Sequence, residues 1–210
     1  MQPLGWRGVN IVPSVGCASL PPSSNNCTLT LTSSTPNLAQ QFTVQGTNTG
    51  AAIASPYVAF RINGGLVFSV SGTSPAATAK VVAETDNNGG IRWYNGTQNI
   101  TGAQSITDGY YNDPATGNPD TGGNTYIITH ATTYGLPNDP ATYAAAVCYN
   151  DISASADNGD WYLPAICELG TYDSNVGGID AGCGSNTANI ESNLFDYGFL
   201  SNLTNTTNYW

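Results

Sequence analysis

The sequence predicts an α+β fold, with short strands in its first half and helices in its second half. In the first half, apolar and polar residues alternate over short runs, which is the period of a half-buried strand. In the second half, two segments show helical spacing behind helix-capping residues. Between them, residues 159–169 predict a core strand through Trp161 and Leu163, which Pro164 leads into a helix of one or two turns.

The N-terminal part of the chain is predicted to be rich in strands. Thr and Leu alternate strictly over residues 28–32, and residues 41–45 and 57–62 repeat the apolar–polar pattern. Residues 1–26 are rich in Pro, Ser and Asn, and we interpret them as a leader or linker. The expected order is therefore this linker and then a strand-rich, β-sandwich-like segment over residues 27–63.

A different pattern begins at residue 64. An apolar run over residues 64–70 predicts a strand, and further strands are predicted to begin at Lys80 and at Gly90. Residues 101–123 are rich in Gly, Asp, Asn and Thr, and they predict a long loop. Long loops inside compact domains are often functional.

Two helices are predicted in the C-terminal half besides the short one after Pro164. Asp139 and Pro140 form a helix start, and the helix is expected to end near residue 150. Its run of three alanines has high helix propensity and allows close packing. The second helix is expected over about residues 188–197, capped by residue 186 or 187 and ended by Gly198.

Composition favours a protein outside the cytosol. Only 9% of the residues are charged, and Asn, Thr, Ser and Gly replace charge as the source of solubility. The chain has 4 basic and 14 acidic residues, so it lacks the clustered Lys and Arg that nucleic acid requires. No run approaches the roughly 18 apolar residues of a membrane-spanning helix. We therefore expect a secreted or cell-surface protein with no nucleic-acid partner and no membrane span.

The five cysteines predict disulfide bonds rather than a metal site. No Cys-x-x-Cys pair occurs, and the single histidine has no cysteine near it in the sequence. Cys17 and Cys27 are placed to close one short loop, and Cys167 and Cys183 are placed to close another. Cys148 is then left over.

Four motifs carry a resemblance to a known family. Asp-Trp-Tyr-Leu-Pro followed by Glu-Leu occupies residues 160–169, and it is preceded by Gly-Gly-x-Val-Phe (64–68), Val-Ala-x-x-Asp (82–86) and Gly-Ile-x-Trp-Tyr-Asn (90–95). In this order the motifs resemble the Lcl C-terminal domain family of bacterial collagen-like adhesins, over residues 64–210. The resemblance implies a C-type-lectin-like domain, with a small antiparallel sheet and two or three short helices, in surface or secreted proteins that are not known enzymes.

The chain departs from the family pattern in two places. The family commonly has Thr or Ser after Leu-Pro, whereas this chain has Ala165, so Glu168 lacks its capping-box partner. The family also continues from Tyr-Trp into further strands, whereas this sequence stops at Trp210. The resemblance implies that the domain is incomplete here, and that the partner of Cys148 lies in a missing C-terminal strand.

The residue pattern does not favour catalysis. A nucleophile needs a base close by, and His130, the single histidine, lies beside an apolar run. Glu168 is the best candidate among the acids, but we favour a structural hydrogen-bonding role for it at the strand–helix junction. Formylglycine-generating enzymes share the broad fold that the resemblance implies, but they need reactive cysteines, and disulfides account better for the cysteines of this chain. We therefore expect no enzyme.

The long loop and its borders hold the candidate binding residues. Hard oxygen ligands and glycines gather there as a calcium site would require, although turn chemistry alone also explains them and the spacing does not fit an EF-hand. The candidate calcium ligands are Asp113, Asn118, Asp120 and Asn124. Flat aromatic rings beside Asn and Asp can stack on sugars, and the candidate ligand-binding residues are Tyr110, Tyr111 and Tyr134. No other cofactor is expected.

We expect an extracellular, non-catalytic module for adhesion, which binds a glycan or a surface protein of a host or of the environment. The namesake of the family is associated with sulfated glycosaminoglycans and with trimers. Four basic residues offer little attraction for a polysulfate, so a neutral glycan or a protein surface fits this chain better. The alternative is a structural or assembly module of a surface appendage, with no small ligand and with its loops at interfaces, for example in a homo-oligomer.

Overall fold

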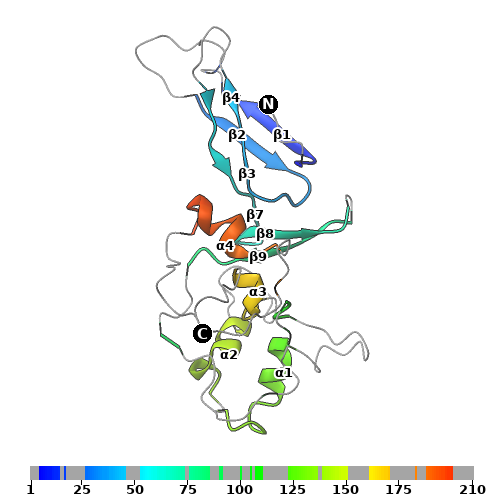
Figure 1. The fold of residues 1–210 in the computed structure, drawn as a ribbon, viewed down its shortest axis with the longest axis vertical. Coiled ribbons are helices and arrows are strands. Elements are labelled where there is room, and N and C mark those ends of the chain that lie inside the picture. Colours follow the sequence, from blue (N-terminus) through cyan, green and yellow to red (C-terminus); the bar gives the residue numbers. More distant parts are fainter. Residues whose placement is uncertain are drawn as a thin grey trace. The chain divides into compact units, whose positions relative to one another are not determined.

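Figure 1 shows the fold of the chain in a computed structural model. It describes residues 5–14, 17, 27–45, 53–73, 76–85, 90–91, 100, 105, 107–110, 123–136, 139–150, 161–170, 183 and 188–200. The chain divides into two compact units, Met1–Ile62 with Val67–Val81, and Asn63–Leu66 with Val82–Trp210. Small antiparallel sheets and short helices make up the described part, which confirms the predicted α+β class.

The first unit contains a long antiparallel strand pair. β1 (Val9–Pro13) lies against β2 (Leu29–Ser33), with all five residues of each strand in register. β2 confirms the strand predicted over residues 28–32. β1 corrects the interpretation of residues 1–26 as a linker, because five of them pair with a strand of the unit.

The next predicted strands are each divided in two. The short strands are β3 (Gln40–Gln41), β4 (Val44–Gln45), β5 (Ile53–Ala54), β6 (Tyr57–Val58) and β7 (Arg61–Ile62). β3 pairs with β6 and β4 pairs with β5, both antiparallel. The predictions over residues 41–45 and 57–62 thus located the extended chain but missed the breaks within it.

The longest described strand follows a two-residue turn. β8 (Gly65–Ser71) lies between β7 and β9 (Thr78–Val82) in one sheet, as Figure 1 shows. Asn63 and Gly64 connect β7 to β8 with φ angles of 48° and 82°, which is the requirement of a type I′ hairpin turn. The domain boundary expected between residues 63 and 64 falls inside this turn, and β8 joins the strand that precedes it. The strand predicted at Gly90 lies mostly outside the described residues.

Aromatic rings form the core of the first unit. Trp6, Phe42, Phe60 and Val67 are buried, and the apolar residues of β1 and β2 pack against them. The ring of Trp6 stacks on Phe42 at 5.8 Å and meets Phe60 edge-on at 5.1 Å. The indole N–H of Trp6 donates to the carbonyl of Leu38 at 3.2 Å, so the ring is buried without leaving a polar atom unpaired.

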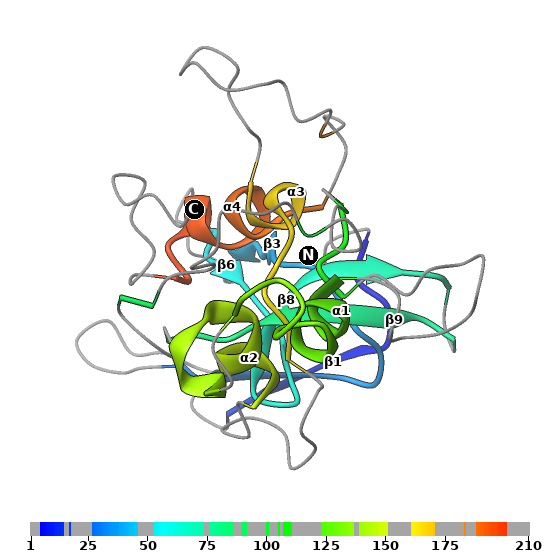
Figure 2. The ribbon, with the colours of Figure 1, turned by 90° about the horizontal axis from the view of Figure 1, so that it is seen from below.

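Two helices lie side by side in the second unit, as Figures 1 and 2 both show. α1 (Gly123–Thr129) was not predicted, because its Thr and Ile residues have low helix propensity. Its buried Ile127 joins a core with residues of the second helix, α2 (Ala144–Tyr149). Tertiary packing therefore stabilises α1 where propensity does not.

The predicted helix after Asp139 is present, but it is broken in two. Asp139 caps the 3₁₀ turn η3 (Pro140–Thr142) by accepting from the Ala141 N–H at 2.9 Å. Tyr143 is extended and buried, and α2 begins after it. The three alanines of α2 are buried, as the sequence analysis expected of a closely packed helix.

The C-terminal helical segment is also divided. It contains α4 (Ile190–Asn193) and the 3₁₀ turn η5 (Phe195–Tyr197), and Gly198 ends it with a φ of 77° as predicted. The cap is Asn189, which accepts from the Ser192 N–H at 2.7 Å, and not residue 186 or 187. Figure 2 shows α4 next to the short helix α3 (Ile166–Leu169).

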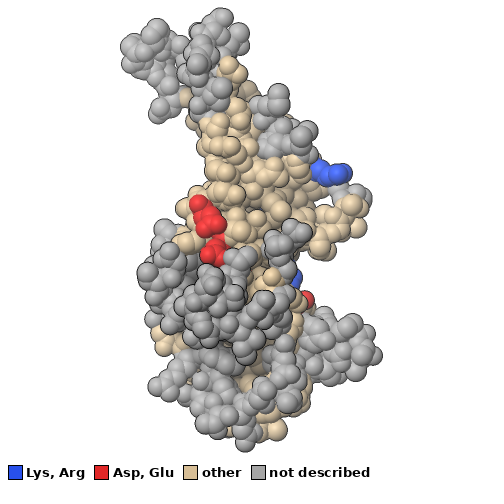
Figure 3. All heavy atoms as spheres, viewed as in Figure 1, with Lys and Arg blue, Asp and Glu red and all other residues tan. Residues whose placement is uncertain are grey.

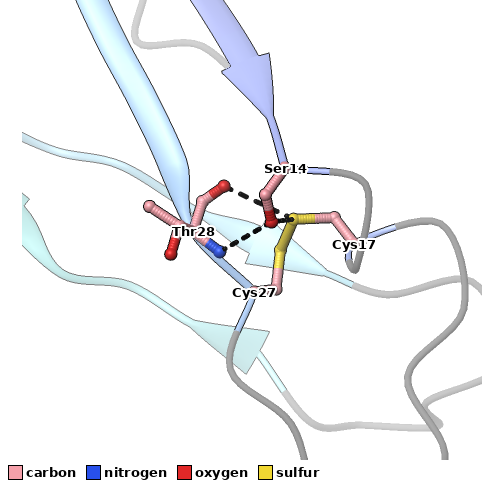
Figure 4. The surroundings of a disulfide bond; sticks show 4 residues. All are labelled: Ser14, Cys17, Cys27 and Thr28. Atoms are coloured by element: carbon pink, nitrogen blue, oxygen red, sulfur yellow. Dashed lines mark hydrogen bonds between the residues drawn. A yellow bond between two sulfur atoms is a disulfide. The ribbon is translucent and has the colours of Figure 1, made fainter.

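Both predicted disulfides are present. Cys17–Cys27 lies at the end of the β1–β2 pair, where Ser14 exchanges backbone and side-chain hydrogen bonds with Thr28 (Figure 4). Cys167–Cys183 joins α3 to a point 16 residues further along the chain. Cys148, half-buried on α2, takes part in neither bond.

We predict one reactive thiol per chain when the protein is titrated under denaturing, non-reducing conditions. The structure assigns that thiol to Cys148, because the other four cysteines are paired. Peptide mapping after alkylation checks the assignment. Three thiols, or a peptide that links Cys148 to Cys167 or Cys183, would contradict it.

The described surface carries little charge. On the face in Figure 3, Lys, Arg, Asp and Glu occupy only a few small areas. No described helix is both long enough and apolar enough to cross a membrane.

Candidate functional site

A buried carboxylate organises the second unit. The side chain of Glu168 is only 2% exposed. Its Oε2 accepts from the backbone N–H groups of Gly109 and Ala165, both at 2.9 Å. Its Oε1 accepts from the hydroxyl of Tyr162 at 3.0 Å. The Glu168 side chain therefore links the segment around Gly109 to the segment that leads into α3. This is the structural hydrogen-bonding role that the sequence analysis favoured for Glu168.

Half of a capping box is present at the start of α3. Glu168 accepts from the N–H of Ala165, but the methyl group of Ala165 cannot accept a hydrogen bond in return. Alanine at this position thus leaves one bond of the two. The Glu168 carboxylate also accepts hydrogen bonds from the Gly109 N–H and the Tyr162 hydroxyl.

Asn124 is a second buried link between the same segments. Its side chain is 3% exposed, Oδ1 accepts from the Leu163 N–H at 3.2 Å, and Nδ2 donates to the Ala145 carbonyl at 3.0 Å. Its backbone N–H donates to the Gly109 carbonyl at 2.9 Å. A Cβ atom at Gly109 would overlap the carbonyl oxygen of Leu163, so this close approach requires glycine.

The strand predicted through Trp161 and Leu163 is wrong, because residues 161–165 form neither a strand nor a helix. Residues 161–165 have no strand partner in the described part of the chain. Their backbone donors pair with side chains instead, Leu163 with Asn124 and Ala165 with Glu168, while Pro164 has no N–H to pair. The alternating sequence pattern was thus a poor guide, because two buried polar side chains take the place of a neighbouring strand.

Tyr110 is an exposed ring on this fixed support. It is 40% exposed, and its ring lies 5.7 Å from that of Tyr162. Its backbone N–H donates to Oδ1 of Asp108 at 3.1 Å. Burial, with the charge and hydrogen bond of Glu168, raises the pKa of Tyr162, so this neighbour stays a neutral donor.

A second aromatic group lies on α1 and the turn that follows it. Tyr126, His130 and Tyr134 are spaced four residues apart and are all half-buried. The His130 ring stacks on Tyr126 with 4.1 Å between centroids, and the two tyrosine hydroxyls are 3.2 Å apart. That hydrogen bond raises the pKa of Tyr126. The spacing of four residues was visible in the sequence, but only α1 and the turn that follows it bring the rings together.

One buried donor has no partner in the described part of the chain. It is the indole Nε1 of Trp161, next to the segment that Glu168 and Asn124 hold.

Neither His130 nor Cys167 forms a nucleophile–base pair with a described residue. His130 Nδ1 lies 3.0 Å from the Thr129 hydroxyl, but it also lies 3.2 Å from the carbonyl of Tyr126. A carbonyl only accepts, so Nδ1 carries a hydrogen in that contact and cannot take one from Thr129. Cys167 is in a disulfide and fully buried. Among the described residues, no three His, Cys, Asp or Glu side chains converge as a metal site would require.

The structure describes only some of the predicted site residues. Tyr110 and Tyr134 belong to the two aromatic groups just described. Tyr111 and three candidate calcium ligands, Asp113, Asn118 and Asp120, lie outside the described residues, so the calcium site stays a prediction. The fourth, Asn124, is buried, and its amide holds Leu163 and Ala145. The sequence analysis missed Gly109, whose only signal is a glycine in a loop.

Models of known protein families, curated proteins and solved structures were compared with this chain, and none matches it.

Proposed function

We propose that this chain is an extracellular, non-catalytic module that binds a neutral glycan, with Tyr110 as an exposed aromatic contact. The observation that carries the proposal is the contrast between the ring of Tyr110 and its support. The ring is open to solvent, whereas Gly109, which precedes it, is held by Glu168 through its N–H and by Asn124 through its carbonyl. A ring carried by a backbone fixed in this way loses less conformational freedom when a ligand binds than a ring on an unfixed loop.

Charge and chemistry support the same proposal. A formal net charge of −10 with 4 basic residues disfavours anionic glycans and nucleic acid. Two disulfides are compatible with an oxidising, extracellular environment. The resemblance of residues 64–210 to the Lcl C-terminal domain family adds an adhesive surface module as the expected class. If Tyr110 contacts a protein ligand instead, the oligosaccharide array described below will contain no neutral binder.

Substituting Tyr110 by alanine is expected to lower the affinity for a neutral glycan about tenfold, because central aromatic contacts commonly contribute more than about 1 kcal/mol. The wild-type protein is first screened on an array of neutral and anionic oligosaccharides, and the best neutral binder is titrated by calorimetry. Tyr197→Ala is the matched control, since Tyr197 is also 40% exposed and lies in the same unit. An array without neutral binders, or equal losses in both variants, would refute the proposal.

A structural or assembly module is the second candidate. One observation favours it: Val12 is 51% exposed on β1, for which the described residues supply one partner strand, β2. An apolar side chain on a strand edge is a common point of association between chains. Light scattering at increasing concentration discriminates between the two, since the glycan-binding proposal does not require association and the assembly module does.

A further inference from the structure

We propose that Tyr126, His130 and Tyr134 form a second subsite for a neutral sugar, in which Nε2 of His130 accepts a hydrogen bond from a sugar hydroxyl. This inference rests on the proposed function and names the chemistry of a second contact. It starts from the protonation of the imidazole. Nδ1 of His130 lies 3.2 Å from the carbonyl oxygen of Tyr126, which only accepts, so Nδ1 carries the hydrogen.

The neighbouring threonine agrees with this tautomer. The hydroxyl of Thr129 lies 3.0 Å from the carbonyl of Thr125 and donates its one hydrogen there. Its oxygen is then left to accept from Nδ1 of His130 at 3.0 Å. Two acceptors therefore hold the hydrogen on Nδ1, and in the neutral ring Nε2 is an acceptor.

Nε2 is also accessible. It makes no hydrogen bond to any described residue, and it is not among the buried polar atoms of the described chain that lack a partner. His130 as a whole is only half-buried. The ring that carries it cannot swing freely, because it stacks on Tyr126 at 4.1 Å with an interplanar angle of 16°.

The surroundings favour a hydroxyl-rich, uncharged ligand. The hydroxyls of the two tyrosines lie 3.2 Å apart, and that hydrogen bond raises the pKa of Tyr126, so Tyr126 stays neutral. The exposed residues that follow His130 are Thr132, Thr133 and Gly135, which carry no charge. An acceptor nitrogen beside half-buried aromatic rings is suited to a sugar, which offers donor hydroxyls and apolar C–H faces.

The experiment compares two substitutions of one residue. His130→Asn keeps an amide N–H near the position of Nδ1 but has no atom at Nε2, whereas His130→Gln places an amide oxygen near Nε2. Cellohexaose, mannohexaose and chitohexaose are the probes, titrated against the whole chain by calorimetry. His130→Asn is expected to bind its probe about three- to tenfold more weakly, the range of one neutral hydrogen bond. His130→Gln should stay within about threefold of wild type, and Thr133→Ala should be unchanged.

Two further readouts make the outcome decisive. Long-range ¹H–¹⁵N NMR of the free protein should show the Nδ1–H tautomer, and thermal melts should show that the variants remain folded. An Nε2–H tautomer, or wild-type affinity in a folded His130→Asn, overturns the subsite. If Tyr110→Ala weakens binding while His130→Asn does not, the proposed function stands and this inference fails. If no probe binds to the wild type, the neutral-sugar subsite is rejected, and the broader array decides the proposed function separately.

Discussion

Replacing Glu168 with alanine is expected to lower the free energy of unfolding by about 3 kcal/mol. The substitution removes the acceptor of the Gly109 and Ala165 N–H groups and of the Tyr162 hydroxyl. A buried donor left unpaired costs about 1–3 kcal/mol, and water entering the vacated space recovers part of that cost. Urea denaturation, followed by tryptophan fluorescence, measures the change.

The matched variants separate the loss of an acceptor from the loss of a charge. Glu168→Gln is expected to cost no more than about 1 kcal/mol, because its amide oxygen can accept from both backbone groups while its NH₂ donates to Tyr162. Asp196→Ala removes an exposed carboxylate of the same unit and should be close to neutral. Equal costs for the alanine and glutamine variants would show that the charge, rather than the hydrogen-bond network, matters.

The second unit shows why local sequence signals predicted helix starts better than the site. Asp139–Pro140 and Gly198 act through their own backbone geometry, and both have the predicted role. The position of Glu168 depends on Gly109, which is 59 residues away. No periodicity encodes such a contact, so the sequence located the carboxylate and its structural role but not its partners.

The same reasoning explains the errors in the predicted strands. Alternation over residues 161–163 indicates an extended chain, but it does not say whether the backbone donors meet a strand or a side chain. At Asn63–Gly64 the turn signal was local and strong, and it was overlooked in favour of a change in composition.

Removing the Cys167–Cys183 disulfide is expected to cost about 3 kcal/mol of stability, the value for closing a loop of about 15 residues. The bond spans 16 residues and fixes α3 through Cys167, which is fully buried one residue before Glu168. Cys183→Ser is the better variant, because it leaves a thiol rather than a buried hydroxyl at Cys167. Denaturation in urea measures the loss.

The effect should extend beyond stability to the site itself. Cys167 and Glu168 belong to the same single turn of helix, so loosening α3 also loosens the carboxylate that holds Gly109. Hydrogen exchange at the Gly109 amide should therefore accelerate in Cys183→Ser, whereas Cys148→Ser, outside both disulfides, should leave it unchanged. A destabilised Cys183→Ser with wild-type exchange at Gly109 would show that the disulfide and the Glu168 network act independently.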